Sequence, residues 1–100
     1  MIKYRLAQPA ADDLFEIWSF IARDNREAAD QFEVSVYRNC ELLADTPLIG
    51  REQTDLARSP FRFWVVHPYK SYLIVYDPTT RPLGIIRILH GARKLPFIVE

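Results

Sequence analysis

Five basic or histidine side chains in the second half of the sequence have the chemistry to bind phosphate: Arg62, Arg87, His90, Arg93 and Lys94. The last three follow one another closely, and the first two can share their face of a sheet. Such a cluster could bind phosphate or stabilise charge in an RNA-cleaving transition state. It could equally bind an acidic peptide, and a lone histidine at the end of a strand is more often structural than catalytic.

Other residues with catalytic potential have simpler explanations. The sequence contains no glycine-rich phosphate loop, no metal-binding cluster and no CxxC pair. We interpret Asp12, Asp13 and Glu16 as capping and solvated groups at a helix start, not as an acid–base pair. Cys40 lies on an apolar helical stripe, which indicates a small buried side chain and not a reactive thiol. We expect no catalytic residues of a common type, no metal and no cofactor.

The composition indicates a single soluble domain covering residues 1–100. Hydrophobic residues make up 49% and charged residues 26% of the 100 residues, which are ordinary values for a globular protein. No apolar run reaches the roughly 18–20 residues that cross a bilayer. The N-terminus is too short and too alternating to be a signal peptide, and the single cysteine suits a reducing compartment. We therefore expect a cytoplasmic protein without a membrane partner.

The charges are unevenly distributed although they sum to zero. Residues 1–50 carry five basic and nine acidic side chains, and residues 51–100 carry eight and four. A basic half can meet a nucleic acid or an acidic partner. A chance placement of acids in helices and arginines in strands explains the asymmetry equally well. Because the whole chain is neutral, we expect no strong independent binding to nucleic acid.

Periodicity predicts one strand followed by two helices in the first half of the chain. Residues 2–6 alternate as in a strand with one wet face. Apolar residues then recur at helical spacing over residues 9–23 and again from Arg26 to just before Thr46, with Asn25 as the N-cap of the second helix. The short connection predicts an antiparallel helical hairpin. The side chains expected to face the sheet are Leu14, Trp18, Phe32, Val36 and Leu43.

The second half predicts a loop and three strands. Residues 47–60 have no clear period and are expected to be a loop, with one turn of helix near residues 55–58. Runs rich in β-branched and aromatic residues follow at 61–66, 72–76 and 83–90, and their short connections predict a three-stranded antiparallel meander. Their aromatic residues interleave with arginines like a base-stacking platform, but cross-strand packing explains them better. The order predicts an α+β fold of two layers, with the hairpin on a four-stranded sheet.

Alternation also assigns faces to the strand residues. It places Ile85, Arg87 and Leu89 on one face of the last strand, opposite Ile86, Ile88 and His90. Burial of an unpaired guanidinium is costly. We therefore expect the faces that carry Arg62 and Arg87 to be turned away from the helices.

Several segments resemble ParE toxins of the RelE/ParE superfamily in their order and spacing. They are Tyr4–Leu6, residues 9–17, residues 47–52 with their proline, glycine and arginine, residues 62–66, residues 72–76 and residues 86–93. The most specific part is the Arg-Ile-Leu-His-Gly-Ala-Arg run at 87–93, and no single motif is diagnostic alone. The resemblance covers nearly the whole chain. It implies a RelE/ParE-like sandwich and a toxin that a cognate, ParD-like antitoxin neutralises.

The resemblance also implies a choice between two mechanisms. ParE toxins poison DNA gyrase, whereas RelE relatives cut messenger RNA on the ribosome with basic residues of the sheet and often a tyrosine or histidine near the C-terminus. Residues 94–100 contain neither tyrosine nor histidine. This departure favours a gyrase inhibitor that is not an enzyme over a ribosome-dependent endoribonuclease, and leaves Arg62, Arg87, His90 and Arg93 for residual catalysis. A degenerate, non-toxic member is a third alternative.

The antitoxin is expected to contribute a partly disordered segment that folds on binding. It would place a helix in an apolar groove beside the hairpin and an extended stretch along the sheet. Its acidic residues would meet Arg62, Arg87 or Arg93. The candidates for contacts with the antitoxin or the target are Arg51, Arg62, Arg87, His90, Arg93 and Lys94.

Overall fold

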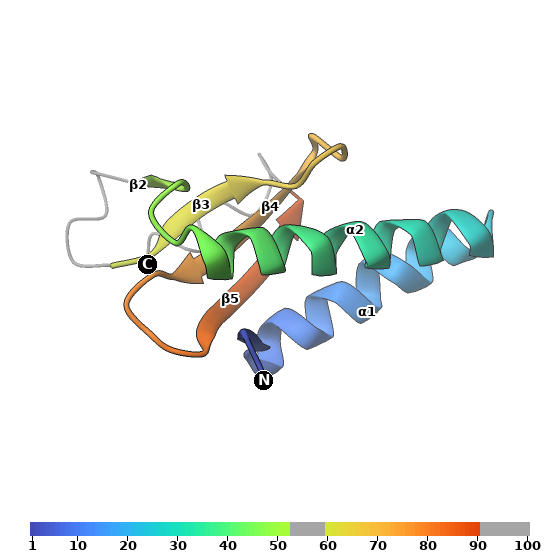
Figure 1. Cartoon of the computed structure of the whole chain (residues 1–100). Coiled ribbons are helices and arrows are strands. Elements are labelled where there is room, and N and C mark those ends of the chain that lie inside the picture. The colour runs from blue at the N-terminus through green and yellow to red at the C-terminus, as the bar shows by residue number, and fades with distance from the viewer. Residues whose placement is uncertain (53–59, 91–100) are drawn as a thin grey trace.

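The computed structural model describes residues 1–52 and 60–90 as a two-layer α+β domain (Figure 1). The elements in chain order are β1 (Tyr4–Leu6), α1 (Gln8–Ala22), α2 (Arg26–Asp45), β2 (Arg51–Glu52), β3 (Arg62–Val65), β4 (Tyr72–Asp77) and β5 (Leu83–His90). The helices form a hairpin that lies on one face of the sheet. The turn of helix expected at 55–58 lies outside the described residues. Within those residues, no helix is long and apolar enough to span a membrane.

The sheet has five strands in the order β1-β5-β4-β3-β2. Strands β3 and β4, and β4 and β5, pair in antiparallel fashion. The sheet as a whole is mixed, because β1 pairs with β5 in parallel, from Tyr4 opposite Leu83 to Leu6 opposite Ile85. The prediction of four strands was wrong by one strand, β2. This strand has only two residues, too few to show an alternating pattern.

The helix boundaries follow from local hydrogen bonds. The side chain of Asn25 accepts a hydrogen bond from the backbone N–H of Ala28 at 3.0 Å, which confirms the predicted cap of α2. The start of α1 has no side-chain cap. Instead, the N–H of Ala7 donates to the carbonyl of Ile85 at 2.8 Å, so the sheet itself fixes the point where α1 begins.

The apolar stripes of both helices pack on the sheet as predicted, with one exception. The helix side chains in this core include Leu14, Phe32, Val36, Cys40 and Leu43. Trp18 is only half-buried, and the prediction that it faces the sheet was wrong. Its indole N–H donates to Asp30 Oδ1 at 2.9 Å, because a tryptophan N–H requires an acceptor. Ile17 and Ile21 of α1 pack against the core.

A β-bulge breaks the predicted alternation of β5. Tyr76 lies opposite Ile85 and Val75 lies opposite Arg87, so Ile86 is an extra residue between the two pairs. The bulge shifts the facing of the residues that follow it. The core side chains of β5 on the helix side are Leu83, Ile85 and Ile88. The side chains that cluster apart from this core, around the buried Val75, are Phe61, Phe63, Leu73, Ile86 and Leu89.

Candidate functional site

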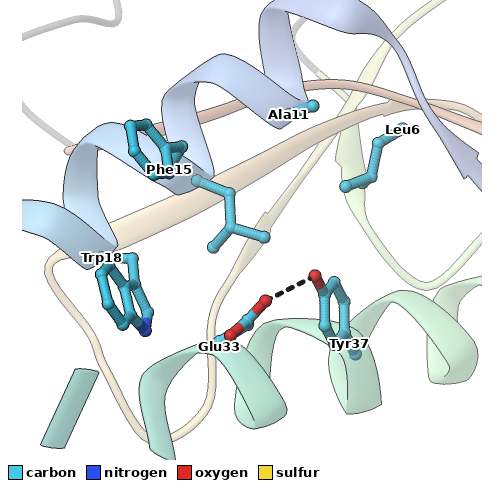
Figure 2. Close-up of a pocket in the computed structure, with 7 residues that line it drawn as sticks. Leu6, Ala11, Phe15, Trp18, Glu33 and Tyr37 are labelled. Atoms are coloured by element: carbon cyan, nitrogen blue, oxygen red, sulfur yellow. Dashed lines mark hydrogen bonds between the residues drawn. The ribbon is translucent and has the colours of Figure 1, made fainter. Parts of the chain in front are cut away.

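An apolar hollow of about 310 Å³ opens between the two helices and β1 (Figure 2). We call it the hairpin groove. Its lining residues are Leu6, Ala11, Leu14, Phe15, Trp18, Glu33 and Tyr37. The ring of Phe15 is 70% exposed, which is unusual for a large apolar side chain. The groove therefore offers apolar surface that a partner could cover.

Two polar side chains of the hairpin groove, Glu33 and Tyr37, lie on α2. The hydroxyl of Tyr37 donates to Glu33 Oε2 at 2.8 Å (Figure 2). Burial is the largest cause and this hydrogen bond the second largest cause that raises the pKa of Tyr37 to about 12. The hydroxyl is therefore protonated at neutral pH and acts as a donor. The helical hairpin as a whole, residues 8–45, carries nine acidic side chains and only three arginines. The hairpin groove thus has apolar walls with one acidic residue, Glu33, among its lining residues, and it lies on a hairpin with an excess of acidic side chains.

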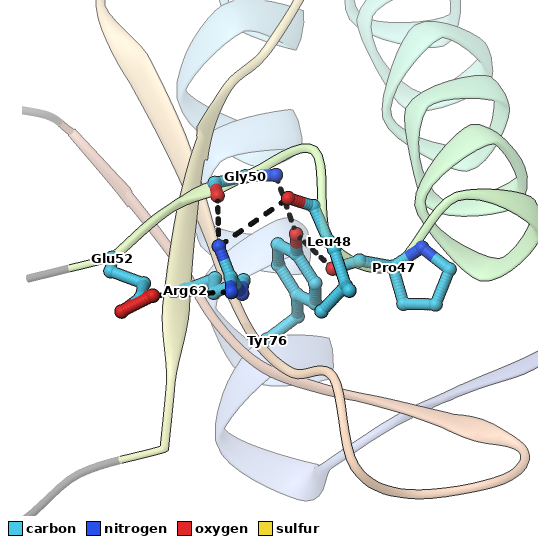
Figure 3. A network of polar contacts seen from close by, with 6 residues as sticks. All are labelled: Pro47, Leu48, Gly50, Glu52, Arg62 and Tyr76. Carbon is cyan, nitrogen blue, oxygen red and sulfur yellow. Dashed lines mark hydrogen bonds and ion pairs between the residues drawn. The ribbon is translucent and has the colours of Figure 1, made fainter.

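Arg62 belongs to a polar network that joins β3 to the segment before β2 (Figure 3). Its guanidinium donates to the carbonyl of Gly50 at 2.8 Å and to Glu52 Oε2 at 3.3 Å. The hydroxyl of Tyr76 donates to the carbonyl of Pro47 at 2.7 Å and accepts from the N–H of Gly50 at 2.8 Å. The side chain of Arg62 is 18% exposed. Its charge therefore holds residues 47–52 in place.

This network corrects the predicted orientation of Arg62. The residue pairs with Tyr76, a fully buried residue of the helix-side core. Its face of β3 also contributes Trp64 and Val66 to that core, so the prediction that this face is turned away from the helices was wrong. The cost of burial applies to an unpaired guanidinium, and carbonyl oxygens and Glu52 pair this one.

Gly50 allows the close approach on which the network depends. A Cβ atom at this position would lie 2.7 Å from Cε1 and 2.8 Å from Cζ of Tyr76. These separations are shorter than any ordinary van der Waals contact. Only glycine fits here without displacing the buried tyrosine ring. This close contact explains why the proline–glycine–arginine segment has a glycine at position 50.

Arg87 is also paired within the chain. Its Nε and Nη2 atoms donate to the two carboxylate oxygens of Asp13 at 2.7 and 2.9 Å. The backbone N–H of Ile88 donates to the same carboxylate at 3.1 Å. The hydrogen bonds to Asp13 raise the pKa of Arg87 despite partial burial. Asp13 is therefore neither a cap nor merely solvated, and nothing in its local sequence indicated a partner 74 residues away.

The structure does not gather the candidate residues into one cluster. Arg62 lies opposite Tyr76, and Arg87 lies opposite Val75. Tyr76 and Val75 are consecutive residues of β4, so their side chains lie on opposite faces of the sheet. Residues opposite each other in neighbouring strands share a face, so Arg62 and Arg87 extend from opposite faces. The prediction that the two arginines share a face was wrong. His90 is exposed, and its ring lies edge-on to Tyr72 with 5.3 Å between centroids. Arg93 and Lys94 lie outside the described residues.

Arg51 is exposed, and its side chain makes no hydrogen bond or ion pair with the described residues. It borders a second hollow, of about 300 Å³, where the pairing of β2 with β3 ends. We call this hollow the edge notch. Its lining residues are Ile49, Arg51, Phe63, Trp64, Val65, His67 and Leu73. The notch thus places the guanidinium of Arg51, which has no partner among the described residues, beside apolar side chains.

Asn39 fixes one wall of the edge notch and was not singled out from the sequence. Its Oδ1 accepts hydrogen bonds from the indole N–H of Trp64 at 2.9 Å and from the backbone N–H of His67 at 3.1 Å. Its amide nitrogen donates to the carbonyls of Ser35 and His67 at 2.6 and 3.0 Å. A polar residue on the otherwise apolar stripe of α2 was the signal. The satisfied amide holds Trp64 and the turn after β3 in fixed positions.

Cys40 behaves as the sequence indicated. The side chain is fully buried in the core, and burial raises the pKa of its thiol to about 12. The thiol therefore remains protonated at neutral pH and is a poor nucleophile. Among the described residues, no group of three or more histidine, cysteine or acidic side chains could hold a metal ion.

The fold is that of a small two-layer α+β domain with hollows at its surface. A family model described as the ParE toxin of type II toxin–antitoxin systems, parDE, matches residues 4–95. The chain therefore belongs to the ParE toxin family. A search of curated proteins found no match.

Proposed function

We propose that this chain is a toxin that inhibits DNA gyrase by binding it and catalyses no reaction itself. Membership of the ParE toxin family supports the toxin role and the pairing with a cognate antitoxin. The observation that carries the non-enzymatic mechanism is the internal pairing of two sheet arginines. Arg62 is bound to Gly50 and Glu52, and Arg87 is bound to Asp13.

This pairing matters because RNA cleavage makes specific demands. A nuclease of this fold would need a base for the 2′-hydroxyl and an acid for the leaving oxygen, both within hydrogen-bond reach. It would also need free cations beside the phosphate. Arginine does not exchange its proton at neutral pH, and the cations of Arg62 and Arg87 already have partners. These features favour binding over catalysis.

One observation favours the alternative, a ribosome-dependent endoribonuclease. His90 lies beside Tyr72, with 5.3 Å between the ring centroids. Imidazole and phenol groups can serve as a proton-transfer pair. Tyr72, however, also packs edge-on against the buried Phe32 with centroids 4.9 Å apart. That contact gives the tyrosine a role in packing.

The two mechanisms differ in the damage that they cause. We would induce the chain in cells without antitoxin and measure DNA breaks and transcript cleavage in parallel, together with supercoiling by purified gyrase. Gyrase inhibition and DNA breaks with intact transcripts are expected. Codon-positioned cuts in messenger RNA that His90→Ala abolishes and Arg5→Ala leaves unchanged would establish the nuclease instead. Arg5 is the matched control because it is exposed on β1, at the opposite edge of the sheet from β2.

We further infer that the hairpin groove receives a helix of the antitoxin. The apolar walls and the exposed ring of Phe15 suit the apolar face of an amphipathic helix. Glu33 in the groove and the excess of acidic side chains on the hairpin suit basic residues along the flanks of that helix. The internal pairing of Arg62 and Arg87 argues against contacts of acidic antitoxin residues with these two side chains. Arg51 is a candidate whose charge has no partner within residues 1–52 and 60–90.

A further inference from the structure

Glu33 places a negative charge inside the hairpin groove. It is the only charged side chain among the described residues that line the hollow. Tyr37 lies one helical turn further along α2, and its hydroxyl donates to Glu33 Oε2 at 2.8 Å (Figure 2). A carboxylate can accept about four hydrogen bonds. Glu33 can therefore bind a further donor while it keeps its contact with Tyr37.

Trp18 gives the groove an aromatic wall that attracts cations. In Figure 2 its indole points from α1 toward α2, which carries Glu33. The face of an indole ring has a negative potential that attracts ammonium and guanidinium groups. One such contact is already present, because the guanidinium carbon of Arg26 lies 5.6 Å from the ring centroid. The carboxylate of Asp30, which accepts the indole N–H at 2.9 Å, adds a negative charge at the edge of the ring.

The remaining walls of the groove suit a hydrocarbon body. They are formed by Leu6, Ala11, Leu14 and Phe15. Sites for small molecules typically combine apolar walls with a few placed polar groups, in hollows of roughly 300–1,000 Å³. The groove, at about 310 Å³, has the size of a small site of this kind.

We propose that the hairpin groove binds a small organic cation, an amine or guanidinium compound with one positive charge and a hydrocarbon body. The positive group donates a hydrogen bond to Glu33 and lies against the indole of Trp18. The hydrocarbon body covers Leu14 and Phe15. A single positive charge matches the single carboxylate, and this pairing offsets the cost of removing both charges from water.

The charge of the groove discriminates against other small ligands. An anion would be repelled by Glu33, and no lysine or arginine is among the described residues that line the groove. A neutral hydrocarbon would cover the carboxylate without supplying a donor, which is costly for a charged group. A cation with an apolar body avoids both penalties.

The cation also regulates the groove, a consequence that rests on the antitoxin helix proposed above. The helix and the cation cover the same apolar walls, so the groove holds only one of them at a time. By mass action, a cation at ten times its dissociation constant raises the apparent dissociation constant of the antitoxin by roughly tenfold. The compound therefore favours free toxin.

Titration of the full chain with hexylammonium, followed by NMR, tests the site without the antitoxin. The two tryptophan indoles report on different hollows, because Trp18 lines the hairpin groove and Trp64 lines the edge notch. The indole N–H signal of Trp18 should shift with a dissociation constant on the order of 0.1–1 mM, and that of Trp64 should stay in place. Hexanol, which has the same chain without the charge, should bind roughly fivefold or more weakly, and hexanoate should bind more weakly still. An unmoved Trp18 signal, equal shifts of both indoles, or equal binding of hexanol would overturn the proposal.

A variant of Glu33 tests the charge itself. Glu33→Gln keeps the shape of the side chain and can still accept from Tyr37. It should weaken hexylammonium binding by roughly fivefold or more and leave hexanol binding unchanged. Glu41→Gln is the matched control, because Glu41 is exposed on α2 and does not line the groove. Equal affinities of the two variants for hexylammonium would contradict the role of Glu33.

The same probe applied to the complex of toxin and antitoxin separates this inference from the proposed function. Hexylammonium at ten times its dissociation constant should weaken antitoxin binding by roughly tenfold, whereas hexanoate should have no effect. If the free chain gives no Trp18 response while the antitoxin still binds, only the cation site fails. If the free chain binds hexylammonium and the antitoxin affinity does not change, the competition fails and the antitoxin helix does not occupy the groove.

Discussion

The carboxylate of Asp13 in α1 receives two hydrogen bonds from the guanidinium of Arg87 in β5, at 2.7 and 2.9 Å. The same carboxylate receives the backbone N–H of Ile88. Strand β1 covers the edge of β5 only as far as Ile85. Beyond the end of β1, the carboxylate of Asp13 accepts the hydrogen bond from the backbone N–H of Ile88 at the edge of β5. The same side chain also holds α1 against β5.

Removal of this charge should destabilise the fold. The side chain of Asp13 is 13% exposed and that of Arg87 is 34% exposed. Asp13→Asn should lower the free energy of unfolding by about 1–2 kcal/mol, after allowance for solvent screening at Arg87. Asp12→Asn is the matched control, because Asp12 is exposed and bonds only to Gln8 among the described residues. Urea denaturation measures both, and equal effects would refute a special role for Asp13.

The sequence predicted the features that depend on local patterns. The helical hairpin follows from apolar spacing, and the cap at Asn25 follows from its residue type and position. The buried positions of Phe32, Val36 and Leu43 follow from the same stripe. These features need only neighbouring residues, so periodicity was sufficient to find them.

The features that the sequence missed depend on contacts between distant segments. The bulge at Ile86 becomes visible only when β5 is paired with β4. The burial of Arg62 becomes acceptable only because Gly50 and Glu52 lie beside it. Asp13 looks like an ordinary acid at a helix start until Arg87 is placed next to it. For the candidate site, sequence supplied Arg51 but not the notch that Asn39 supports.

Trp18 and Leu14 should differ in their contributions to stability. Leu14 is 5% exposed in the core, so Leu14→Ala should cost about 2–5 kcal/mol. Trp18 lies at the surface of the hairpin with Arg26 over its ring at 5.6 Å. Trp18→Ala should therefore cost only about 1–2 kcal/mol, from lost contacts and the hydrogen bond to Asp30. Thermal or urea unfolding measures the difference. A larger loss for Trp18 than for Leu14 would place the indole in the core.

The hairpin groove can be tested with two phenylalanines of the same helix. Phe15 is 70% exposed and lines the groove, whereas Phe20 is 64% exposed and does not. Phe15→Gln should weaken antitoxin binding by roughly 10–100-fold, because burial of the ring in the complex is lost. Phe20→Gln should leave affinity unchanged, and both should alter stability by no more than about 0.5 kcal/mol. Titration calorimetry gives the affinities, and equal losses would rule out the groove as the specific site.

Removal of the Tyr76 hydroxyl should lower the free energy of unfolding more than the loss of one atom suggests. Tyr76→Phe leaves the N–H of Gly50 and the carbonyl of Pro47 without their partner in a buried site. The expected loss is about 1–3 kcal/mol in the free energy of unfolding. Tyr72→Phe is the control, because its hydroxyl makes no hydrogen bond among the described residues, and it should change stability by about 0.5 kcal/mol or less. Similar losses for both variants would show that the network around Gly50 contributes little.

The buried thiol of Cys40 and the half-buried hydroxyl of Tyr37 make the stability of the fold sensitive to alkaline pH. Burial raises the pKa of Cys40 from 9.0 to about 12. Burial and the hydrogen bond to Glu33 raise the pKa of Tyr37 from 10.0 to about 12. In both cases the unfolded chain releases its proton at a lower pH than the folded chain. The stabilising effect is fully present below pH 9 and is lost as the pH rises toward 12, because the unfolded state then binds fewer protons.

Urea denaturation across this alkaline range measures the effect. The free energy of unfolding should fall by up to about 1.4 kcal/mol per pH unit for the one proton of Cys40, with a further fall from Tyr37 above its unfolded pKa. Cys40→Ala should be less stable at pH 7 but should show a shallower decline from pH 9. Val36→Ala is the control, because it removes a comparable part of the same buried helix stripe without removing a titratable group. It should keep the slope of the unaltered chain. A Cys40→Ala protein with that same slope would show that the buried thiol ionises as readily in the folded state as in the unfolded state.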